Sequence, residues 1–243
     1  MRYIISPHLD DAVLSCSAVL LANPASTVIT VFGGDPPARV ALTAWDRQCG
    51  FAASSLAQPS RRREDRAALK LLGARPIWLD FQDHQYGYAS PTELIVAALD
   101  RAIPHNAIVF GPLGLTHPDH IQVASACRSL QRDQPGSRIF YAYADVPYRA
   151  SNNGRELAAK LPSLQTSGVS PVACTGLHDS VEQKAKLVAL GRYASQLVAL
   201  KMSGLDMDDC VRPEQFWRLT RYWSPSGLDF GRRGYLSVHE PTE

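Results

Sequence analysis

The chain has 243 residues, of which 45% are apolar and 20% are charged, and its 25 Lys and Arg against 23 Asp and Glu give a net charge of +2. This composition excludes wholesale disorder, and so small a basic excess argues against a surface built to hold nucleic acid. No apolar run reaches the roughly 18 residues of a membrane-spanning helix, and the N-terminus lacks the apolar core of a secretory signal. Five scattered cysteines without a C-x-x-C pair indicate reduced thiols, so we expect a cytoplasmic protein.

The first part of the chain alternates short β-rich runs with helical patterns. In chain order, the predicted elements are a strand at 3–5, a helix at 10–22, a strand at 27–32, a helix at 61–72, a strand at 77–79, a helix at 91–102, a strand at 107–110, a helix at 118–132 and a strand at 139–143. Gly73 is predicted to end the second helix. Such alternation predicts βαβ units, and continuous apolar strands predict a mostly parallel sheet with helices on both faces.

Beyond the last of these strands the pattern is sparser. A strand is predicted over 172–177 and a long helix over 182–200, and the residues from Ser224 onward are typical of a loop with one short strand. The chain shows no linker and no internal repeat. We therefore expect a single domain over residues 1–243.

Two groups of polar side chains follow predicted strands. His8, Asp10 and Asp11 come directly after the first strand, and His117 and His120 follow the fourth. In an open parallel sheet, ligands bind outside the carboxyl ends of the strands, so both groups are expected at one edge of the sheet.

Imidazole and carboxylate groups are the usual ligands of catalytic zinc, which takes three protein ligands and keeps a fourth position for water. Two His and one Asp satisfy that count, a second carboxylate can act as general base, and a further His can stabilise an oxyanion or protonate a leaving group. Each group alone has a simpler interpretation, because Asp-Asp is a common helix start and His-x-x-His is often a surface feature. Their joint placement at one sheet edge favours a metal site.

The segments Pro7-His8-Leu9-Asp10-Asp11 and His117-Pro118-Asp119-His120 resemble the two motifs of the PIG-L/LmbE family of zinc-dependent deacetylases, which act on N-acetylglucosamine-type sugars and related conjugates. The second motif matches in full, whereas the first has Leu9 in place of the usual Pro and Ala12 in place of the usual Glu. The run 6–15 resembles a subgroup associated with natural-product and glycan tailoring. The resemblance spans most of residues 1–220 and implies a Rossmann-like three-layer α/β sandwich with its active site at the carboxyl ends of the strands.

The resemblance also implies a role for each residue of the motifs. The implied ligands of Zn²⁺, or of another divalent metal, are His8, Asp11 and His120. Asp10 is the implied general base, and His117 is the implied charged partner that stabilises the tetrahedral intermediate or assists the leaving amine. Asp119 is expected to orient a neighbouring His.

Further candidates come from the segments beside the two motifs. The candidate substrate-binding residues are Arg61, Asp83, Asp145 and Tyr148. Arg61 resembles the family's substrate-binding Arg, with the adjacent Arg62 as the alternative match, while Asp83 and Asp145 have an alternative interpretation as turn or cap residues. Leu115 stands where some relatives carry a Tyr that helps to hold the oxyanion, so zinc and His117, or another residue such as Tyr148, must take over that charge. Trp45 and Asp46 are expected on a loop over the site.

The sequence therefore predicts a zinc-dependent hydrolase that removes an N-acetyl group from an N-acetylated amino sugar or sugar conjugate, with a small molecule rather than nucleic acid or a membrane as its partner. Two alternatives stay open. The first is an amidase that acts on a non-acetyl or non-sugar substrate, which a substrate panel separates. The second is a metal- or glycan-binding protein without turnover, which an acetate assay separates.

Overall fold

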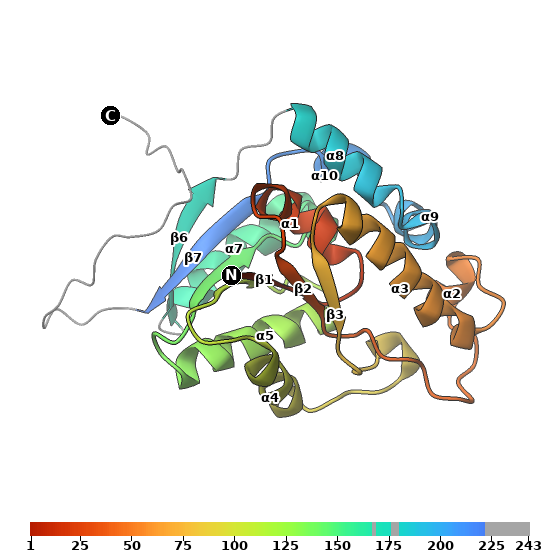
Figure 1. Ribbon diagram of the computed structural model, residues 1–243, viewed down its shortest axis with the longest axis horizontal. Helices are drawn as coiled ribbons and strands as arrows, with labels where there is room; N and C mark the ends of the chain where they lie inside the picture. Colours follow the sequence, from red (N-terminus) through yellow and green to blue (C-terminus); the bar gives the residue numbers. More distant parts are fainter. Residues whose placement is uncertain (167–168, 176–179, 222–243) are drawn as a thin grey trace, which may run out of the picture.

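The apolar runs up to Tyr143 form five parallel strands of one sheet in the computed structural model, which describes residues 1–166, 169–175 and 180–221 (Figure 1). Seven strands lie in the order β3-β2-β1-β4-β5-β7-β6. Their bounds are β1 (Arg2–Ser6), β2 (Thr27–Thr30), β3 (Arg75–Trp78), β4 (Ile108–Pro112), β5 (Ile139–Tyr143), β6 (Val169–Thr175) and β7 (Gln215–Arg221). β7 runs antiparallel to both β5 and β6, whereas the pairs among β1 to β5 are parallel. The predicted mostly parallel sheet is confirmed.

Helices cover both faces of this sheet. Their bounds are α1 (Asp11–Ala22), α2 (Ala44–Gln48), α3 (Ser54–Leu71), α4 (Thr92–Ala102), α5 (Pro118–Asp133), α6 (Val146–Arg149), α7 (Arg155–Thr166), α8 (Ser180–Leu190), α9 (Ala194–Met202) and α10 (Met207–Cys210), with 3₁₀ turns η1 (His84–Tyr86) and η2 (Ser151–Gly154). One core cluster joins α4, α5 and α7 to the sheet, and a second joins α1, α3 and α8 to its other face. This arrangement is the expected three-layer α/β sandwich.

Two of the predicted helices differ in the structure, and α2, α6, α7, α10 and β7 were not predicted. α3 begins at Ser54 rather than at residue 61 and contains Pro59. The predicted helix 182–200 is instead the pair α8 and α9, with a turn at Gly191–Tyr193. The turn is set by contacts with α3, because the buried Tyr193 hydroxyl donates to Asp65 at 2.8 Å. The spacing of apolar residues along the chain cannot predict such a long-range contact.

Three further expectations from the sequence concern the cysteines, membrane-spanning helices and the C-terminal segment. Cys16, Cys49, Cys127 and Cys210 are buried free thiols. Within the described ranges, no helix is both long and apolar enough to cross a membrane. The predicted strand 172–177 is described as far as Thr175, within β6, and the loop predicted from Ser224 lies outside the described residues.

α1 is interrupted at Cys16, whose φ of −137° and ψ of 21° are not helical. Next to the break, the carboxylate of Glu214 accepts from the backbone N–H groups of Ser17 and Ala18, at 2.8 and 3.1 Å. Lys186 Nζ of α8 donates to the same carboxylate at 2.9 Å, and both charged side chains are fully buried. A buried ion pair thus caps the second half of α1.

Replacing Lys186 by Met is expected to lower the free energy of unfolding by roughly 3–5 kcal/mol, because removal of one partner leaves a buried charge without compensation. Urea unfolding monitored by circular dichroism measures the change. Lys184→Met on the exposed face of the same helix is the matched control, with an expected effect within about 0.5 kcal/mol. Equal stability of the two variants would show that Lys186 does not compensate Glu214.

Candidate metal and catalytic site

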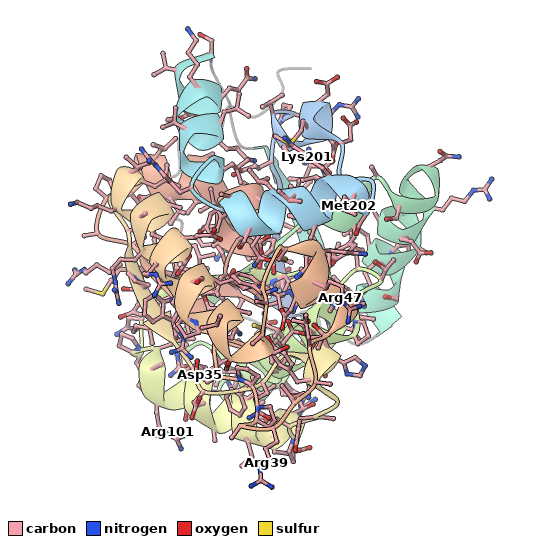
Figure 2. The ribbon with its side chains drawn as sticks, turned by 90° about the vertical axis from the view of Figure 1, so that its right-hand side faces the viewer. Asp35, Arg39, Arg47, Arg101, Lys201 and Met202 are labelled. Atoms are coloured by element: carbon pink, nitrogen blue, oxygen red, sulfur yellow. The ribbon has the colours of Figure 1, made fainter. Side chains whose placement is uncertain are left out.

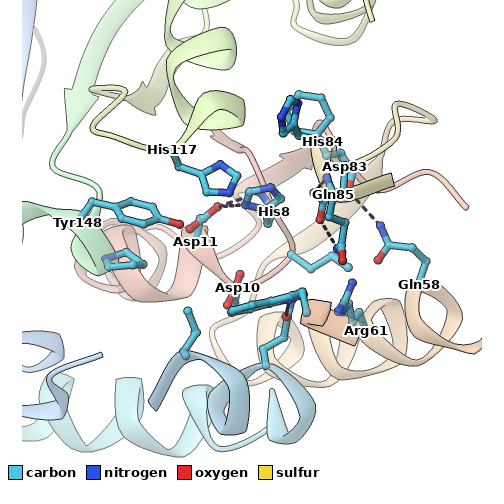
Figure 3. A pocket seen from close by; sticks show the side chains of 16 residues that line it. His8, Asp10, Asp11, Gln58, Arg61, Asp83, His84, Gln85, His117 and Tyr148 are labelled. Atoms are coloured by element: carbon cyan, nitrogen blue, oxygen red, sulfur yellow. Dashed lines mark hydrogen bonds and ion pairs between the residues drawn. The ribbon is translucent and has the colours of Figure 1, made fainter. Parts of the chain in front are cut away.

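A cavity of about 340 Å³ opens at the carboxyl ends of the five parallel strands (Figure 3). Each of these strands is followed by residues of the cavity wall: His8–Asp11 after β1, Phe32 after β2, Asp83–Gln85 after β3, His117 after β4, and Pro147 with Tyr148 after β5. Helical elements contribute Trp45, Gln58, Arg61, Gln196 and Leu200. Figure 2 shows α9 crossing next to α2, where Trp45 Nε1 donates to Gln196 Oε1 at 3.3 Å.

The first motif forms the turn from β1 into α1. Asp10 occupies the N-cap position of α1, but its side chain makes no capping hydrogen bond and instead lines the cavity. Asp11 is turned inward, and its Oδ2 accepts from the backbone N–H of His8 at 2.8 Å. The same oxygen lies 3.4 Å from His8 Nδ1 and 3.1 Å from His120 Nε2. Asp11 therefore stands between two imidazoles from different strand ends.

The second motif is the start of α5. His117 is the N-cap, and its Nδ1 accepts from the backbone N–H of Asp119 at 3.2 Å, while Pro118 takes a first-turn position that needs no N–H donor. His120 lies in the first turn of the helix and is buried. The ring centroids of His8, His117 and His120 lie 5.0 to 5.5 Å apart. The motif thus works as a helix start that aims two imidazoles at the first motif.

The turn that leads into this helix is held by Asp145. Gly114 has a φ of +82°, and a Cβ there would lie 2.6 Å from the Cβ of Ala124, so only glycine fits. The Oδ2 atom of Asp145 accepts from the backbone N–H groups of Gly114 and Leu115 at 2.9 and 3.1 Å. Its Oδ1 atom lies 2.6 Å from His120 Nδ1. Asp145 was expected to bind substrate, but it is fully buried behind His120, away from the cavity wall, and both oxygens are occupied.

The donor atoms suit a cation with nitrogen and oxygen ligands. His120 Nε2 is buried and faces Asp11 Oδ2 at 3.1 Å, while its Nδ1 lies 2.6 Å from Asp145 Oδ1. His8 shows the same pattern, because its Nε2 lies 2.8 Å from Asp119 Oδ2 and its Nδ1 faces Asp11. An imidazole whose second nitrogen is held by a carboxylate is the usual form of a metal-binding His.

Other donor sets lie close by. Ligand atoms of His8, His117 and His120 lie within 4.8 Å of one another, and so do those of His8, Asp83 and Asp119. Nδ1 of His117 accepts a hydrogen bond from a backbone amide, so only its Nε2 is left for a metal. The expected set His8, Asp11 and His120 is a third candidate, in which Asp11 Oδ2 lies 3.4 Å from His8 Nδ1 and 3.1 Å from His120 Nε2.

Electrostatics separate the roles of the remaining groups. Burial and the neighbouring Asp11 charge raise the pKa of Asp10 to about 7, which suits a general base near neutral pH. Burial and the adjacent His8 and His120 lower the pKa of His117 to about 3, so its imidazole is neutral. Burial raises the pKa of Tyr148, which keeps its hydroxyl a donor. These shifts favour the neutral form of His117, and the charged partner expected there stays a prediction.

The predicted substrate-binding residues other than Asp145 lie in the cavity wall. Arg61 and Asp83 line the cavity, and Asp83 also accepts from Gln85 at both oxygens, so its turn interpretation holds as well. Tyr148 lies beside the motif, with its ring 5.8 Å from that of His117 and 5.0 Å from that of His120. Figure 3 shows the Tyr148 hydroxyl pointing toward Asp11. Leu115 is buried in the apolar core and offers no donor.

Sequence reasoning missed the residues that hold Arg61. Asp46, expected only on a loop over the site, is fully buried and accepts from Arg61 Nη2 at 2.7 Å and from the Tyr86 hydroxyl at 3.1 Å. Gln58 and Gln196 of the cavity wall were also missed. In the sequence, a Gln that lines a cavity cannot be distinguished from a Gln on the protein surface.

A doubly covered parallel sheet with a His/Asp cluster at its carboxyl edge defines a Rossmann-like protein with a candidate metal site. The chain belongs to the PIG-L family, whose profile, described as GlcNAc-PI de-N-acetylase, matches residues 3–130. The expected family is thereby confirmed.

Individual relatives agree with this assignment. The 2'-N-acetylparomamine deacetylase of Streptomyces fradiae is 28% identical over 233 residues, which cover 86% of this chain and 75% of that protein. The crystal structure of A40926 pseudoaglycone deacetylase is 27% identical, with a TM-score of 0.73 over 92% of this chain and 98% of that one. The zinc-inhibited form of teicoplanin deacetylase shares the fold, with a TM-score of 0.74 and 24% identity over 93% of this chain and 100% of that one. The relatives are thus deacetylases.

Proposed function

We propose that this protein is a metal-dependent N-deacetylase that hydrolyses the acetamide of an N-acetylated amino sugar or sugar conjugate in natural-product or glycan biosynthesis, and that it works as a single domain. The observation that carries the proposal is the carboxylate of Asp10, which makes no capping bond and faces the cavity beside the His8, Asp11 and His120 donors. Membership of the PIG-L family and the deacetylase relatives support the reaction type.

His8 Nδ1, a carboxylate oxygen of Asp11 and His120 Nε2 hold the metal in this proposal, and Asp119 and Asp145 fix the orientation of the two imidazoles. Zn²⁺ is the metal we propose, because two His and one Asp match the ligand number of a catalytic zinc site. When bound, the ion acidifies water and polarises the acetamide carbonyl.

The chain's own residues carry the proton transfers. Asp10 takes a proton from the attacking water and returns it to the departing amine, for which a pKa of about 7 is suited. Because His117 accepts a hydrogen bond at Nδ1, its ring proton resides on Nε2 and can be donated to the oxyanion. The protonated hydroxyl of Tyr148 is a second donor, and it compensates for the apolar side chain at Leu115.

An assay of acetate release tests this proposal directly. Purified protein is assayed with N-acetylglucosamine and a series of N-acetylated glycosides, with and without a chelator, and its metal content is measured in parallel. We expect about one zinc ion per chain and acetate release that the chelator abolishes and added zinc restores.

Each other outcome points elsewhere. Acetate released only from non-sugar acetamides would support the broader amidase, and release of a different acid would change the acyl group. Bound zinc without turnover of any substrate would leave a binding protein. Full activity in the chelator, with no zinc in the protein, would contradict the metal-dependent mechanism.

A further inference from the structure

Two polar atoms in the wall of the cavity have no hydrogen-bond partner within the part of the chain that the structure describes. They are Gln58 Oε1, which is an acceptor, and Arg61 Nε, which is a donor. Both side chains line the cavity, and each is only 2% exposed. Buried polar atoms without partners are rare in folded proteins, and each one calls for an explanation.

The fold fixes both groups in place. Gln58 and Arg61 are three residues apart on α3, so they project from the same face of the helix. Gln58 Nε2 donates to the carbonyl of Phe32 at 3.2 Å, which sets the orientation of the amide and leaves Oε1 as the free end. Arg61 Nη2 is held by the buried Asp46 at 2.7 Å. Figure 3 shows both side chains on the α3 side of the cavity, with Gln58 extending toward Asp83 and Gln85.

The pair suits a group that both donates and accepts a hydrogen bond. A hydroxyl offers one hydrogen to an acceptor and lone pairs to a donor, so a ligand hydroxyl that displaces water satisfies Gln58 and Arg61 together. A carboxylate pairs with the guanidinium but meets the lone pairs of the Gln58 oxygen. An ammonium pairs with that oxygen but is repelled by the guanidinium charge.

We propose that Gln58 is a specificity-determining residue which, with Arg61, binds one hydroxyl group of the substrate apart from the acetamide that reacts. The substrate class is then a hydroxylated ring, as in an amino sugar, rather than a simple acetamide. This inference rests on the proposed function, because it places the hydroxyl-bearing ring in the same cavity as the reacting group.

The test is a binding cycle that does not depend on turnover. The probes are the methyl glycoside of N-acetylglucosamine and analogues that each lack one hydroxyl, and their Kd values are measured by calorimetry on the zinc-loaded Asp10→Asn protein with and without Gln58→Met. One analogue is expected to bind about tenfold more weakly than the parent sugar when Gln58 is present and equally well when it is absent.

Gln131→Met is the matched control for this cycle. Its Nε2 likewise donates to a backbone carbonyl, that of Leu219 at 2.8 Å, and its Oε1 is likewise buried without a partner, but it lies outside the cavity wall. This variant is expected to keep the penalty for the missing hydroxyl. Thermal melting shows that each variant is folded.

The outcomes separate the two proposals. Equal penalties for every analogue with and without Gln58, or no binding of any probe, overturn the assignment of Gln58. If one hydroxyl contributes to binding only when Gln58 is present, but the unsubstituted protein releases no acetate, the hydroxyl site stands and the deacetylase activity is overturned. If the unsubstituted protein releases acetate but no hydroxyl depends on Gln58 for its contribution to binding, the deacetylase activity stands and the hydroxyl site is overturned.

Discussion

Asp10→Asn is expected to lower acetate release by roughly 10²- to 10⁴-fold, the usual contribution of a general base, while the metal stays bound. The amide has nearly the same shape as the carboxylate, but it cannot take a proton from water. Asp10 makes no capping bond to α1, so the substitution removes no helix-stabilising contact. The proposed metal ligands are the neighbouring Asp11 and the two imidazoles, which the change leaves in place.

The measurement combines initial rates of acetate release with zinc content and thermal melting of the same preparations. Asp35→Asn is the matched control, because its carboxylate is 60% exposed and pairs with Arg62 on the surface at 2.9 Å. That variant is expected to keep its rate. If Asp10→Asn retains more than about a tenth of the rate, the base lies elsewhere, since even the smallest usual contribution is larger.

Much of the site could be predicted because its determinants are local. His8, Asp10 and Asp11 form a strand-to-helix turn, and His117 with Pro118 is a helix start that can be recognised from the chain alone. The carboxyl ends of β1 and β4 are adjacent in the sheet, so the alternating pattern was sufficient to bring the two motifs together.

The residues that support the site could not be predicted in the same way. Asp145 and Tyr148 both follow β5, three positions apart, and both were expected to bind substrate, yet one is buried behind His120 and the other lines the cavity. Their difference depends on the short α6 and on the turn at Gly114, which Asp145 holds from about thirty residues away. Asp46 likewise acquires its role only when the fold brings it to Arg61 of α3.

Long-range packing also explains the errors in the elements. Pro59 and the polar residues around it argue against a helix before residue 61, but α3 begins at Ser54 and buries Ala57, Gln58 and Arg61 against the rest of the fold. β7 lies between β5 and β6 as an antiparallel strand, and its pairing cannot be read from its own residues.

Asp145→Asn is expected to weaken zinc binding by roughly 10- to 100-fold, the usual cost of losing a carboxylate that orients a metal-binding imidazole, while the fold persists. The Asn carbonyl oxygen can still accept from the N–H groups of Gly114 and Leu115. Its NH₂ group then faces His120 Nδ1, which must become the acceptor. The ring proton moves to Nε2, and a protonated Nε2 has no lone pair for a metal.

Zinc affinity by competition with a chelating dye measures this effect, and thermal melting separates it from unfolding. Asp145→Ala is expected to lose stability as well, because each of the two backbone N–H groups left unpartnered costs roughly 1–3 kcal/mol. Asp65→Asn is the matched control, since this buried carboxylate accepts from Trp78 and Tyr193 and from no His. It is expected to keep its zinc affinity. Unchanged zinc affinity in Asp145→Asn would restrict Asp145 to holding the turn, and high zinc that restores acetate release would confirm that the defect lies in metal binding.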